Sequence, residues 1–274
     1  MPELPEVETI RRELKPRVIN QKIQGCTLLR KDVIGYPKAK DFCTSIIDKQ
    51  IIDVTRRAKY LILELSHDSR IIFHLRLSGT IYLRNRDAQH ERFTRVIITL
   101  NDYQLFFNEP RVLGRIYFLQ NDKNIKIPKG YYTLGYEPIS PEFDLNYFRN
   151  KINGRKAKIK ALLLDQSICA GVGNIYSDEA LFHAGIRPLR KANKLTVIET
   201  FKLLVSLKSV LYRAIDNFGT SIGDYTRTDG KNGKFQNSLY VYSREHEPCR
   251  ICGTKIAIQK ISNRSTRYCP TCQK

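Results

Sequence analysis

Residues 1–14 read MPELPEVETIRREL and give the first structural signal in the chain. Apolar Val7, Ile10 and Leu14 recur at the spacing of one helix face, and a proline at position 5 suits the first turn of a helix. The stretch therefore predicts an amphipathic helix that begins immediately behind the N-terminus.

The same stretch places a nucleophile next to an acid. A small residue after the initiator methionine normally allows Met1 to be removed, which would expose the secondary amine of Pro2 beside the carboxylate of Glu3. Such an amine can attack a sugar aldehyde carbon and form a cationic iminium. An α-amino group titrates at about 7.7 to 8.0, so a fraction of it is neutral at neutral pH. Taken alone, this stretch has a plain alternative: it is a helix start that is rich in proline and glutamate and has no catalytic role.

The charge composition indicates a polyanionic partner. The 274 residues include 47 Lys and Arg against 27 Asp and Glu, which gives a formal net charge of +20 and a pI near 9.7. No apolar run approaches the roughly 18 residues of a membrane helix, so we expect nucleic acid as the partner and no membrane. The acidic N-terminus lacks the pattern of a signal peptide, which predicts a cytoplasmic protein, nucleoid-associated if bacterial.

The N-terminal half carries a strand pattern. Short runs rich in Ile, Val, Leu, Phe and Tyr occur at 22–30, 51–57, 60–65, 71–77, 95–100 and 104–108. Several short strands at this spacing favour a β-sandwich or barrel over a parallel sheet with crossover helices. We expect a β-sandwich domain over residues 1–130, with the N-terminal helix packed on it.

The chain becomes polar and loop-like over 121–141, and helical periodicity follows. Helices are predicted at 142–153, 156–165, 177–184 and 196–217. The last of these carries an apolar face formed by Val197, Phe201, Leu204, Leu207, Leu211 and Ile215. We assign a helical domain to residues 131–245.

A double-glycine turn, CAGVGNIY at 169–176, separates the second and third of these helices. A turn this tight can direct backbone N–H groups at a phosphate, with the Asn174 side chain reaching further. On its own the motif is weak, because plain helix connections often have the same composition.

Four of the seven cysteines form two CxxC pairs near the end of the chain, at Cys249, Cys252, Cys269 and Cys272. Two such pairs at this separation suit a tetrahedral zinc ion, with strands at 256–261 and 266–268 folding back as a hairpin. The predicted zinc finger, 246–274, has too small a core to fold alone, so metal binding would supply its folding energy. A redox CxxC motif is the alternative.

The other three cysteines are isolated in the sequence: Cys26, Cys43 and Cys169. Thiols stay reduced in the cytosol, and free cysteine is among the most buried residue types. We therefore expect buried thiols at these positions and no bridges.

The N-terminal MPELPEVET, the segment from LLLDQ to GVGNIYSDEALFHAGIRP and the four-cysteine tail together resemble the formamidopyrimidine-DNA glycosylase family, whose members excise oxidised bases and nick the abasic strand. The resemblance covers nearly the whole chain. It implies an α+β multidomain fold with an N-terminal β-sandwich, a helix-two-turn-helix domain and a four-cysteine zinc-finger hairpin. It also implies one structural Zn2+, damaged double-stranded DNA as the partner, and a monomer without an obligate protein partner.

The resemblance assigns catalytic roles to particular residues. It makes Pro2 the nucleophile, Glu3 the group for general acid/base steps, and Glu6 a second acid near the site. Lys59 and Arg264 match residues of the catalytic site that bind the phosphates around the lesion. For Lys59, an ordinary solvated lysine between two strands is the plain alternative.

The resemblance also implies DNA contacts outside the reacting groups. Arg111, Lys156 and Asn174 match the family's DNA-binding residues. Residues 220–236 lie where the family has a mobile loop that closes over an extruded base. A merely solvated loop is an equal alternative there.

The chain departs from the family pattern at several recognition positions. Leu77 stands where the family has a methionine in an HLxMSG-like segment, and Leu113 stands where PRRFG has its phenylalanine, although Arg111 is retained. The segment Arg92-Phe93-Thr94-Arg95 stands where the family usually has Lys-His, and Arg267 replaces an aromatic residue beside Tyr268. Because none of these is a catalytic group, the departures concern the lesion and the opposite base.

The sequence predicts a bifunctional glycosylase and abasic-site lyase that excises an oxidised or ring-opened base, and it leaves two alternatives. An oxidised-pyrimidine glycosylase that resembles bacterial endonuclease eight would have the same catalytic groups. A non-catalytic zinc-finger DNA-binding protein would keep Lys59, Asn174 and the four cysteines but would have no reason to keep Pro2 and Glu3.

Overall fold

The computed structural model describes residues 2–120, 127 and 129–274, which form two compact units. The first unit combines Met1–Pro128 with Asn217–Gln236, and the second combines Lys129–Asp216 with Asn237–Lys274. The segment 217–236, here called the returning segment, therefore belongs to the same unit as the N-terminus. Met1 and part of the predicted linker, at 121–126 and 128, lie outside the described residues.

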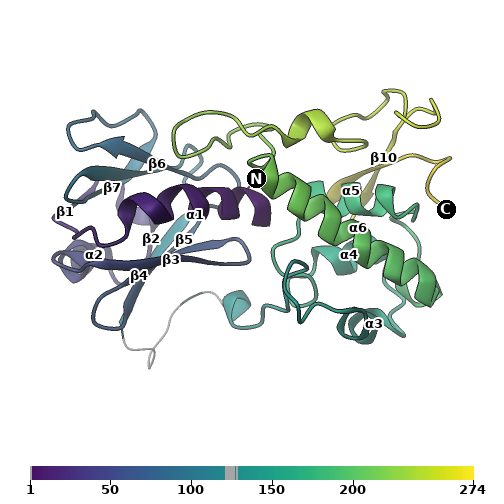
Figure 1. Ribbon diagram of the computed structural model, residues 1–274, viewed down its shortest axis with the longest axis horizontal. Coiled ribbons are helices and arrows are strands. Elements are labelled where there is room, and N and C mark those ends of the chain that lie inside the picture. The colour runs from purple at the N-terminus through teal and green to yellow at the C-terminus, as the bar shows by residue number, and fades with distance from the viewer. Residues whose placement is uncertain (1, 121–126, 128) are drawn as a thin grey trace. The chain divides into compact units, whose positions relative to one another are not determined.

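Two β-sheets form the body of the first unit (Figure 1). One has the strand order β1-β7-β8-β6, and the other has the order β2-β9-β5-β4-β3. Neighbouring strands are antiparallel except β2 and β9, which are parallel. The strands are β1 (Gly25–Leu28), β2 (Ile34–Tyr36), β3 (Ile51–Arg57), β4 (Tyr60–Leu65), β5 (Ser69–His74), β6 (Thr80–Asn85), β7 (Thr94–Thr99), β8 (Tyr103–Asn108) and β9 (Arg115–Gln120).

The predicted β-sandwich and N-terminal helix are confirmed. Side chains from both sheets share one core with α1 (Leu4–Val18), which contacts β3 and β4 and buries Val7, Ile10 and Leu14. The helix begins as expected, with Glu3 and Glu6 forming a capping box at its first turn. The first unit also contains a short 3-10 turn, η1 (Lys31–Val33), and a second helix, α2 (Ala39–Ile46).

Several strands and one helix were not predicted from the sequence: β2, β6, β9 and α2. The strand predicted at 71–77 ends earlier, because β5 stops at His74. Leu77 therefore lies in the connection between β5 and β6 and not on a strand. This connection contains Arg76 in the left-handed region, with φ of 55°, which ends the extended conformation.

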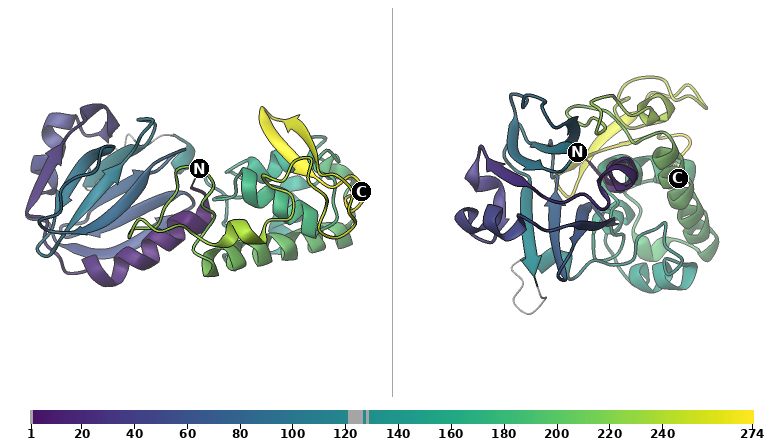
Figure 2. Two further views of the ribbon diagram at one scale, coloured as in Figure 1. Left: turned by 90° about the horizontal axis from the view of Figure 1, so that it is seen from above. Right: turned by 60° about the vertical axis from the view of Figure 1, so that its left-hand side comes forward.

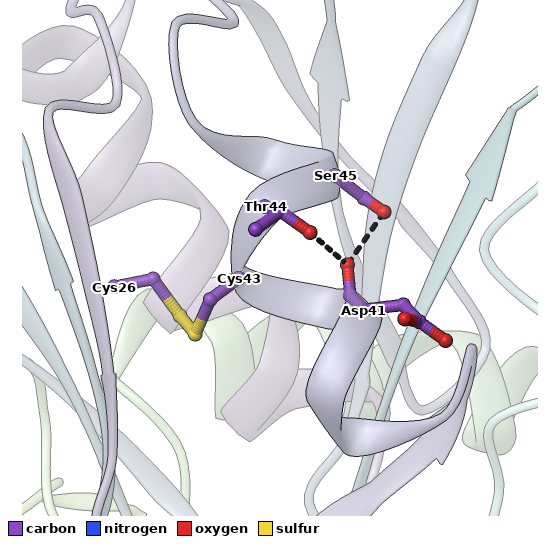
Figure 3. Close-up of a disulfide and its surroundings, with 5 residues drawn as sticks. All are labelled: Cys26, Asp41, Cys43, Thr44 and Ser45. Carbon is purple, nitrogen blue, oxygen red and sulfur yellow. Dashed lines mark hydrogen bonds between the residues drawn. A yellow bond between two sulfur atoms is a disulfide. The ribbon is translucent and has the colours of Figure 1, made fainter.

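The prediction of free thiols at Cys26 and Cys43 is wrong, because the two residues form a disulfide (Figure 3). The bridge joins β1 to α2, whose packing brings the two Cα atoms within 5.2 Å, a distance typical of disulfides. The hydroxyls of Thr44 and Ser45 donate to the backbone carbonyl of Asp41 beside the bridge. Cys169 is a buried free thiol, as predicted, and burial raises its pKa.

Helices build most of the second unit. The longest, α6, contacts α3 and α5, and α5 also contacts α4 and a β-hairpin. These helices are α3 (Leu145–Ile152), α4 (Ile159–Leu164), α5 (Asn174–His183) and α6 (Val197–Asp216), with 3-10 turns η3 (Lys129–Tyr131), η4 (Ala192–Lys194) and η5 (Phe235–Ser238). Among the helices of the described part of the chain, none is both long and apolar enough to cross a lipid bilayer.

The predicted apolar face of α6 is partly wrong. Four of the predicted residues are buried as expected, but the exposed fractions of Val197 and Phe201 are 46% and 52%. The four are Leu204, Leu207, Leu211 and Ile215. The core side of the helix instead includes Thr200 and Leu203, so the buried face is rotated from the predicted one. The 3.6-residue period was read correctly, but the sequence pattern does not say which of two adjacent apolar stripes faces the core.

The hairpin of the second unit consists of β10 (Ala257–Ile261) and β11 (Arg264–Tyr268), drawn in yellow in Figure 2. Its tip is Ser262 and Asn263, both with positive φ, so β11 begins two residues before the predicted strand at 266–268. Arg264 is consequently the first residue of β11 and is exposed. The hairpin packs on α5 through β11.

Candidate functional site

The start of α1 holds the predicted nucleophile and acid in a buried environment. Pro2 is buried, and the exposed fractions of Glu3 and Glu6 are 1% and 0%. The backbone N–H of Glu3 donates to Oε2 of Glu6 at 2.7 Å, and the backbone N–H of Thr220 donates to Oε1 of Glu6 at 2.8 Å. The Glu6 carboxylate thus joins the residues behind the N-terminus to the returning segment.

Gly219 makes this approach possible. Its φ is +75°, and a Cβ atom at this position would lie 2.8 Å from Oε1 of Glu6. A side chain would therefore be strained and would collide with the carboxylate.

The returning segment is held to the first unit at a second place. Glu13, on α1, accepts from Nε of Arg227 at 2.6 Å and from both the N–H and the hydroxyl of Thr228, at 3.0 and 2.7 Å. The hydroxyl of Thr80 donates to the carbonyl of Thr226 at 3.0 Å. The residues between Thr220 and Thr226 therefore lie between two anchored points.

Lys59 and His74 occupy adjacent ends of strands. Lys59 follows Ala58, whose φ of 51° marks the tight connection from β3 to β4, and Tyr60 pairs with His74 across β4 and β5. The rings of Tyr60 and His74 meet edge to face, 4.5 Å apart. Burial, with help from the positive charges of Arg76 and Lys59, lowers the pKa of His74 to about 3, so its imidazole is neutral at neutral pH.

The two leucines that replace family residues lie in loops. Leu77 is half-buried in the β5–β6 connection, and Leu113 is 43% exposed in the β8–β9 connection. Arg111, two residues before Leu113, is largely exposed, and its Nη2 lies 3.3 Å from Oδ2 of Asp224 in the returning segment. This exposed ion pair is weak, so the Arg111 guanidinium is accessible to another partner.

Asn174 lies within a buried polar network of the second unit. It is the first residue of α5, which begins three residues earlier than predicted, directly after Gly173. Its Oδ1 accepts from Nζ of Lys160 at 2.7 Å, and its Nδ2 donates to the carbonyl of Ser265 on β11 at 3.0 Å. The Asn174 side chain is therefore fixed beside the residue that follows Arg264.

Lys160 and Asp178 complete this network, and the sequence analysis missed both. Nζ of Lys160 lies 2.6 Å from Oδ1 of Asp178, and neither side chain is exposed. Oδ2 of Asp178 accepts from the backbone N–H of Arg267 at 3.1 Å. Burial raises the pKa of Asp178, and the Lys160 ammonium opposes that rise. A lone lysine inside the apolar run IKALLL was the signal that would have indicated a buried cation.

Two other predicted residues differ in their surroundings. Lys156 is exposed in the connection between α3 and α4, where it is open to solvent. Arg267, by contrast, bonds to Glu245 at 3.1 Å and lies over the ring of Tyr242, 4.7 Å from its centroid. The substitution at position 267 therefore supplies a contact within the second unit.

The four predicted zinc ligands come together as a tetrahedral site requires. Their Sγ atoms all lie within 4.8 Å of one another, with 3.9 Å between Cys249 and Cys272 and 3.4 Å between Cys252 and Cys269. Four thiolates around a zinc ion, at Zn–S distances of roughly 2.3 Å, stand about 3.8 Å apart. The site fits one structural zinc, and four protein ligands leave no open position on the ion.

Three family models match successive parts of the chain. They are the formamidopyrimidine-DNA glycosylase N-terminal domain over residues 1–116, the H2TH domain of the same glycosylase over 134–226, and a zinc finger found in FPG and IleRS over 247–274. Together they match most of the sequence.

Relatives and solved structures agree with these models. The formamidopyrimidine-DNA glycosylases of Pelotomaculum thermopropionicum and Herpetosiphon aurantiacus are 43% and 40% identical, over 100% of this chain and 99% and 100% of theirs. A Lactococcus lactis FPG mutant in complex with DNA containing Fapy-dG is 36% identical, with a TM-score of 0.91 and 100% of both chains covered. MutM in complex with DNA containing carbocyclic 8-oxo-G is 37% identical, with a TM-score of 0.90 and the same coverage. The chain belongs to the formamidopyrimidine-DNA glycosylase family.

Proposed function

We propose that this chain extrudes an oxidised or ring-opened base from duplex DNA, excises it, and cleaves the strand at the resulting abasic site. As a member of its family the chain is a DNA glycosylase of base-excision repair. The observation that carries the mechanism is the buried Pro2–Glu3 pair at the start of α1.

The chemistry follows from these two groups. Once the base is outside the stack, the Pro2 nitrogen attacks C1′ and the base leaves with the bonding electrons and a proton. Glu3 transfers protons during opening of the sugar ring. The resulting iminium acidifies C2′, so loss of a C2′ proton expels the 3′ phosphate, and a second elimination expels the 5′ phosphate. The zinc ion takes no part in these steps, because its four thiolates hold it as a structural ion.

Lys59, Lys156, Asn174 and Arg264 bind phosphates in this proposal. Phosphate contacts supply affinity and register but little base information. Because His74 is neutral at neutral pH, it adds no positive charge beside Lys59 and Arg76. Base recognition is left to Arg111 and to the loops that carry Leu77 and Leu113.

Arg264→Ala should weaken binding to lesion-containing and undamaged duplexes by similar factors. Each phosphate neutralised by Lys or Arg contributes about 0.9 to the slope of log K against log salt, so the slope should fall by about one. Fluorescence anisotropy across a salt series measures it, with Lys255→Ala as a control cation in the same zinc finger. A change in lesion preference with an unaltered slope would contradict a phosphate contact.

Leu77 and Leu113 predict a substrate preference. To keep a base extruded, inserted side chains must offset a few kcal/mol of unstacking, and leucine neither threads a narrow gap as methionine does nor stacks as phenylalanine does. We expect poorer excision of well-stacked 8-oxoguanine than of ring-opened lesions. The double change Leu77→Met/Leu113→Phe should raise the single-turnover rate on 8-oxoguanine about tenfold, or about 1.4 kcal/mol, and leave abasic-site cleavage unchanged. Equal rates on 8-oxoguanine would mean that the leucines are neutral replacements.

A panel of lesion duplexes tests the proposed function against its alternatives. The proposal expects base release and strand cleavage from duplexes with ring-opened or oxidised purines. Faster release of oxidised pyrimidines would favour an enzyme similar to endonuclease eight. Tight DNA binding without base release from any duplex would favour a non-catalytic DNA-binding protein. We also propose that the chain acts in the compartment that holds the DNA. We further propose that it acts as a monomer, which sedimentation with and without a lesion duplex tests.

A further inference from the structure

A buried carboxylate joins two loops of the first unit. Glu109 has an exposed fraction of 0% and lies at the start of the connection between β8 and β9. Its Oε1 accepts from the hydroxyl of Ser78 and from the backbone N–H of Arg111, the latter at 3.1 Å. Its Oε2 accepts from the backbone N–H of Gly114 at 2.9 Å. We call Glu109 with these three donors the carboxylate clamp.

The clamp spans both connections that carry the substituted recognition residues. Residues 75–79 connect β5 to β6 and include Ser78, and residues 109–114 connect β8 to β9. Leu77 directly precedes Ser78, and Leu113 directly precedes Gly114. Arg111 donates to the carboxylate through its own backbone N–H, so its side chain remains available.

Glycines allow the loops to close around the carboxylate. A Cβ at Gly114 would lie 2.7 Å from Oε2 of Glu109 and 2.8 Å from the Phe107 ring. A Cβ at Gly79 would lie 2.5 Å from the carbonyl of Leu75 and 3.1 Å from the same Oε2. The loops therefore pack on Glu109 closely enough that a small movement of either one would disturb the other.

A hydroxyl and two backbone amides donate to the buried carboxyl group, and a buried acceptor is left unsatisfied at a cost if any of these donors moves away. The guanidinium of Arg95 donates to the Glu109 backbone carbonyl at 2.8 Å and holds the start of the loop in place. A buried polar group whose hydrogen bonds are satisfied rigidifies its surroundings. The clamp is thus suited to hold two loops in one relative position.

We propose that Glu109 is a positioning residue for base extrusion, which holds the loops of Leu77, Arg111 and Leu113 together so that these side chains enter the vacated stack as one rigid unit. The inference rests on the proposed function, because only an enzyme that extrudes a base needs such an insertion. Glu109 itself contacts neither substrate nor reacting atoms. Its effect should appear in the extrusion step and not in the chemistry at an abasic site.

Glu109→Gln tests this role. The amide keeps the shape of the side chain but has one acceptor oxygen, so either Gly114 or the pair of Ser78 and Arg111 loses its acceptor. The loss of one buried acceptor should slow single-turnover excision from a matched duplex by about 10- to 100-fold. Cleavage of a pre-formed abasic site should fall far less. A 2-aminopurine base beside the lesion, which brightens on unstacking, should show a slower or smaller rise.

Glu179→Gln is a matched control in the second unit. Glu179 is also fully buried and accepts three backbone N–H bonds, from Tyr240, Val241 and Tyr242, each at 2.9 Å. Its replacement should reduce stability without changing the ratio of excision to abasic-site cleavage. If Glu109→Gln does not fold, Ser78→Ala removes one donor and should shift the same ratio in the same direction by a smaller factor.

The outcomes separate this inference from the proposed function. The clamp would be overturned if folded Glu109→Gln and Ser78→Ala both kept the wild-type ratio of excision to abasic-site cleavage and the wild-type 2-aminopurine signal. The proposed function would still stand in that case, provided that the wild-type protein excises bases. Absence of excision by the wild-type protein would instead refute the function. If Glu179→Gln changed the same ratio, the effect of Glu109→Gln would be explained by general destabilisation, which would also overturn the clamp.

Discussion

Pro2→Gly should remove nearly all base excision and abasic-strand cleavage while leaving binding to an abasic-site duplex largely intact. Glycine supplies a primary amine, whose imine can lose its proton and become neutral, whereas the iminium of proline stays cationic and keeps drawing electrons. The ring of Pro2 also fixes the backbone that directs the nitrogen. Gel assays of strand cleavage under single-turnover conditions measure the loss.

Two further variants define the cause of that loss. Glu3→Gln removes the acid/base group and should slow turnover by about 10²- to 10⁴-fold. Pro5→Ala alters a proline in the first turn of α1 but leaves the amine of Pro2 in place, so it should retain cleavage. Wild-type cleavage rates in Pro2→Gly would show that another group is the nucleophile.

Removal of zinc should abolish specific DNA binding. The four thiolates hold a hairpin whose folding depends on the ion, and structural zinc sites of this kind contribute about 10 to 16 kcal/mol of apparent binding free energy. Loss of the hairpin would also remove the Ser265 carbonyl that holds Asn174 and the contact of Asp178 with Arg267. Anisotropy titrations before and after chelation, and again after zinc is restored, measure the effect.

Cysteine variants distinguish the effect of losing the zinc ion from the effect of losing a thiol elsewhere in the protein. Cys269→Ser should reproduce the effect of chelation, whereas Cys169→Ser replaces a buried thiol outside the zinc site and should retain zinc and binding. The sandwich of the first unit has its own core, so its β-sheet circular dichroism should persist in both. Full DNA binding by zinc-free protein would contradict this account.

The sequence predicted best those features that repeat or stand close together in the chain. The α1 periodicity, the helices of the second unit and the two CxxC pairs are local patterns, and each was recovered with small shifts of its ends. Strands β3, β4, β5, β7 and β8 were recovered for the same reason, although β6 and β9, whose apolar runs are similar, were missed. Pro2 and Glu3 could be proposed as a site from the sequence because they are adjacent in the chain.

The features that the sequence did not predict depend on distant partners. β2 has only three residues and is stabilised by pairing with β9, more than seventy positions further along the chain. The disulfide of Cys26 with Cys43 depends on α2, which was not predicted. Lys160 with Asp178, and Glu109 with Ser78, are polar residues whose burial follows from packing between separate elements. The apolar run around Lys160 indicates a buried cation, but the sequence does not identify Asp178 as its partner.

Sodium borohydride trapping with peptide mapping tests the central claim most directly. Reduction of an equimolar mixture of protein and abasic-site duplex should convert the iminium to a stable amine and so link protein to DNA. Mass spectrometry after digestion should place the nucleotide on the N-terminal peptide, at the nitrogen of Pro2 with Met1 removed. An adduct on Lys59, Lys156 or any other lysine, or no adduct with protein that cleaves the strand, would contradict the assignment of Pro2 as the nucleophile.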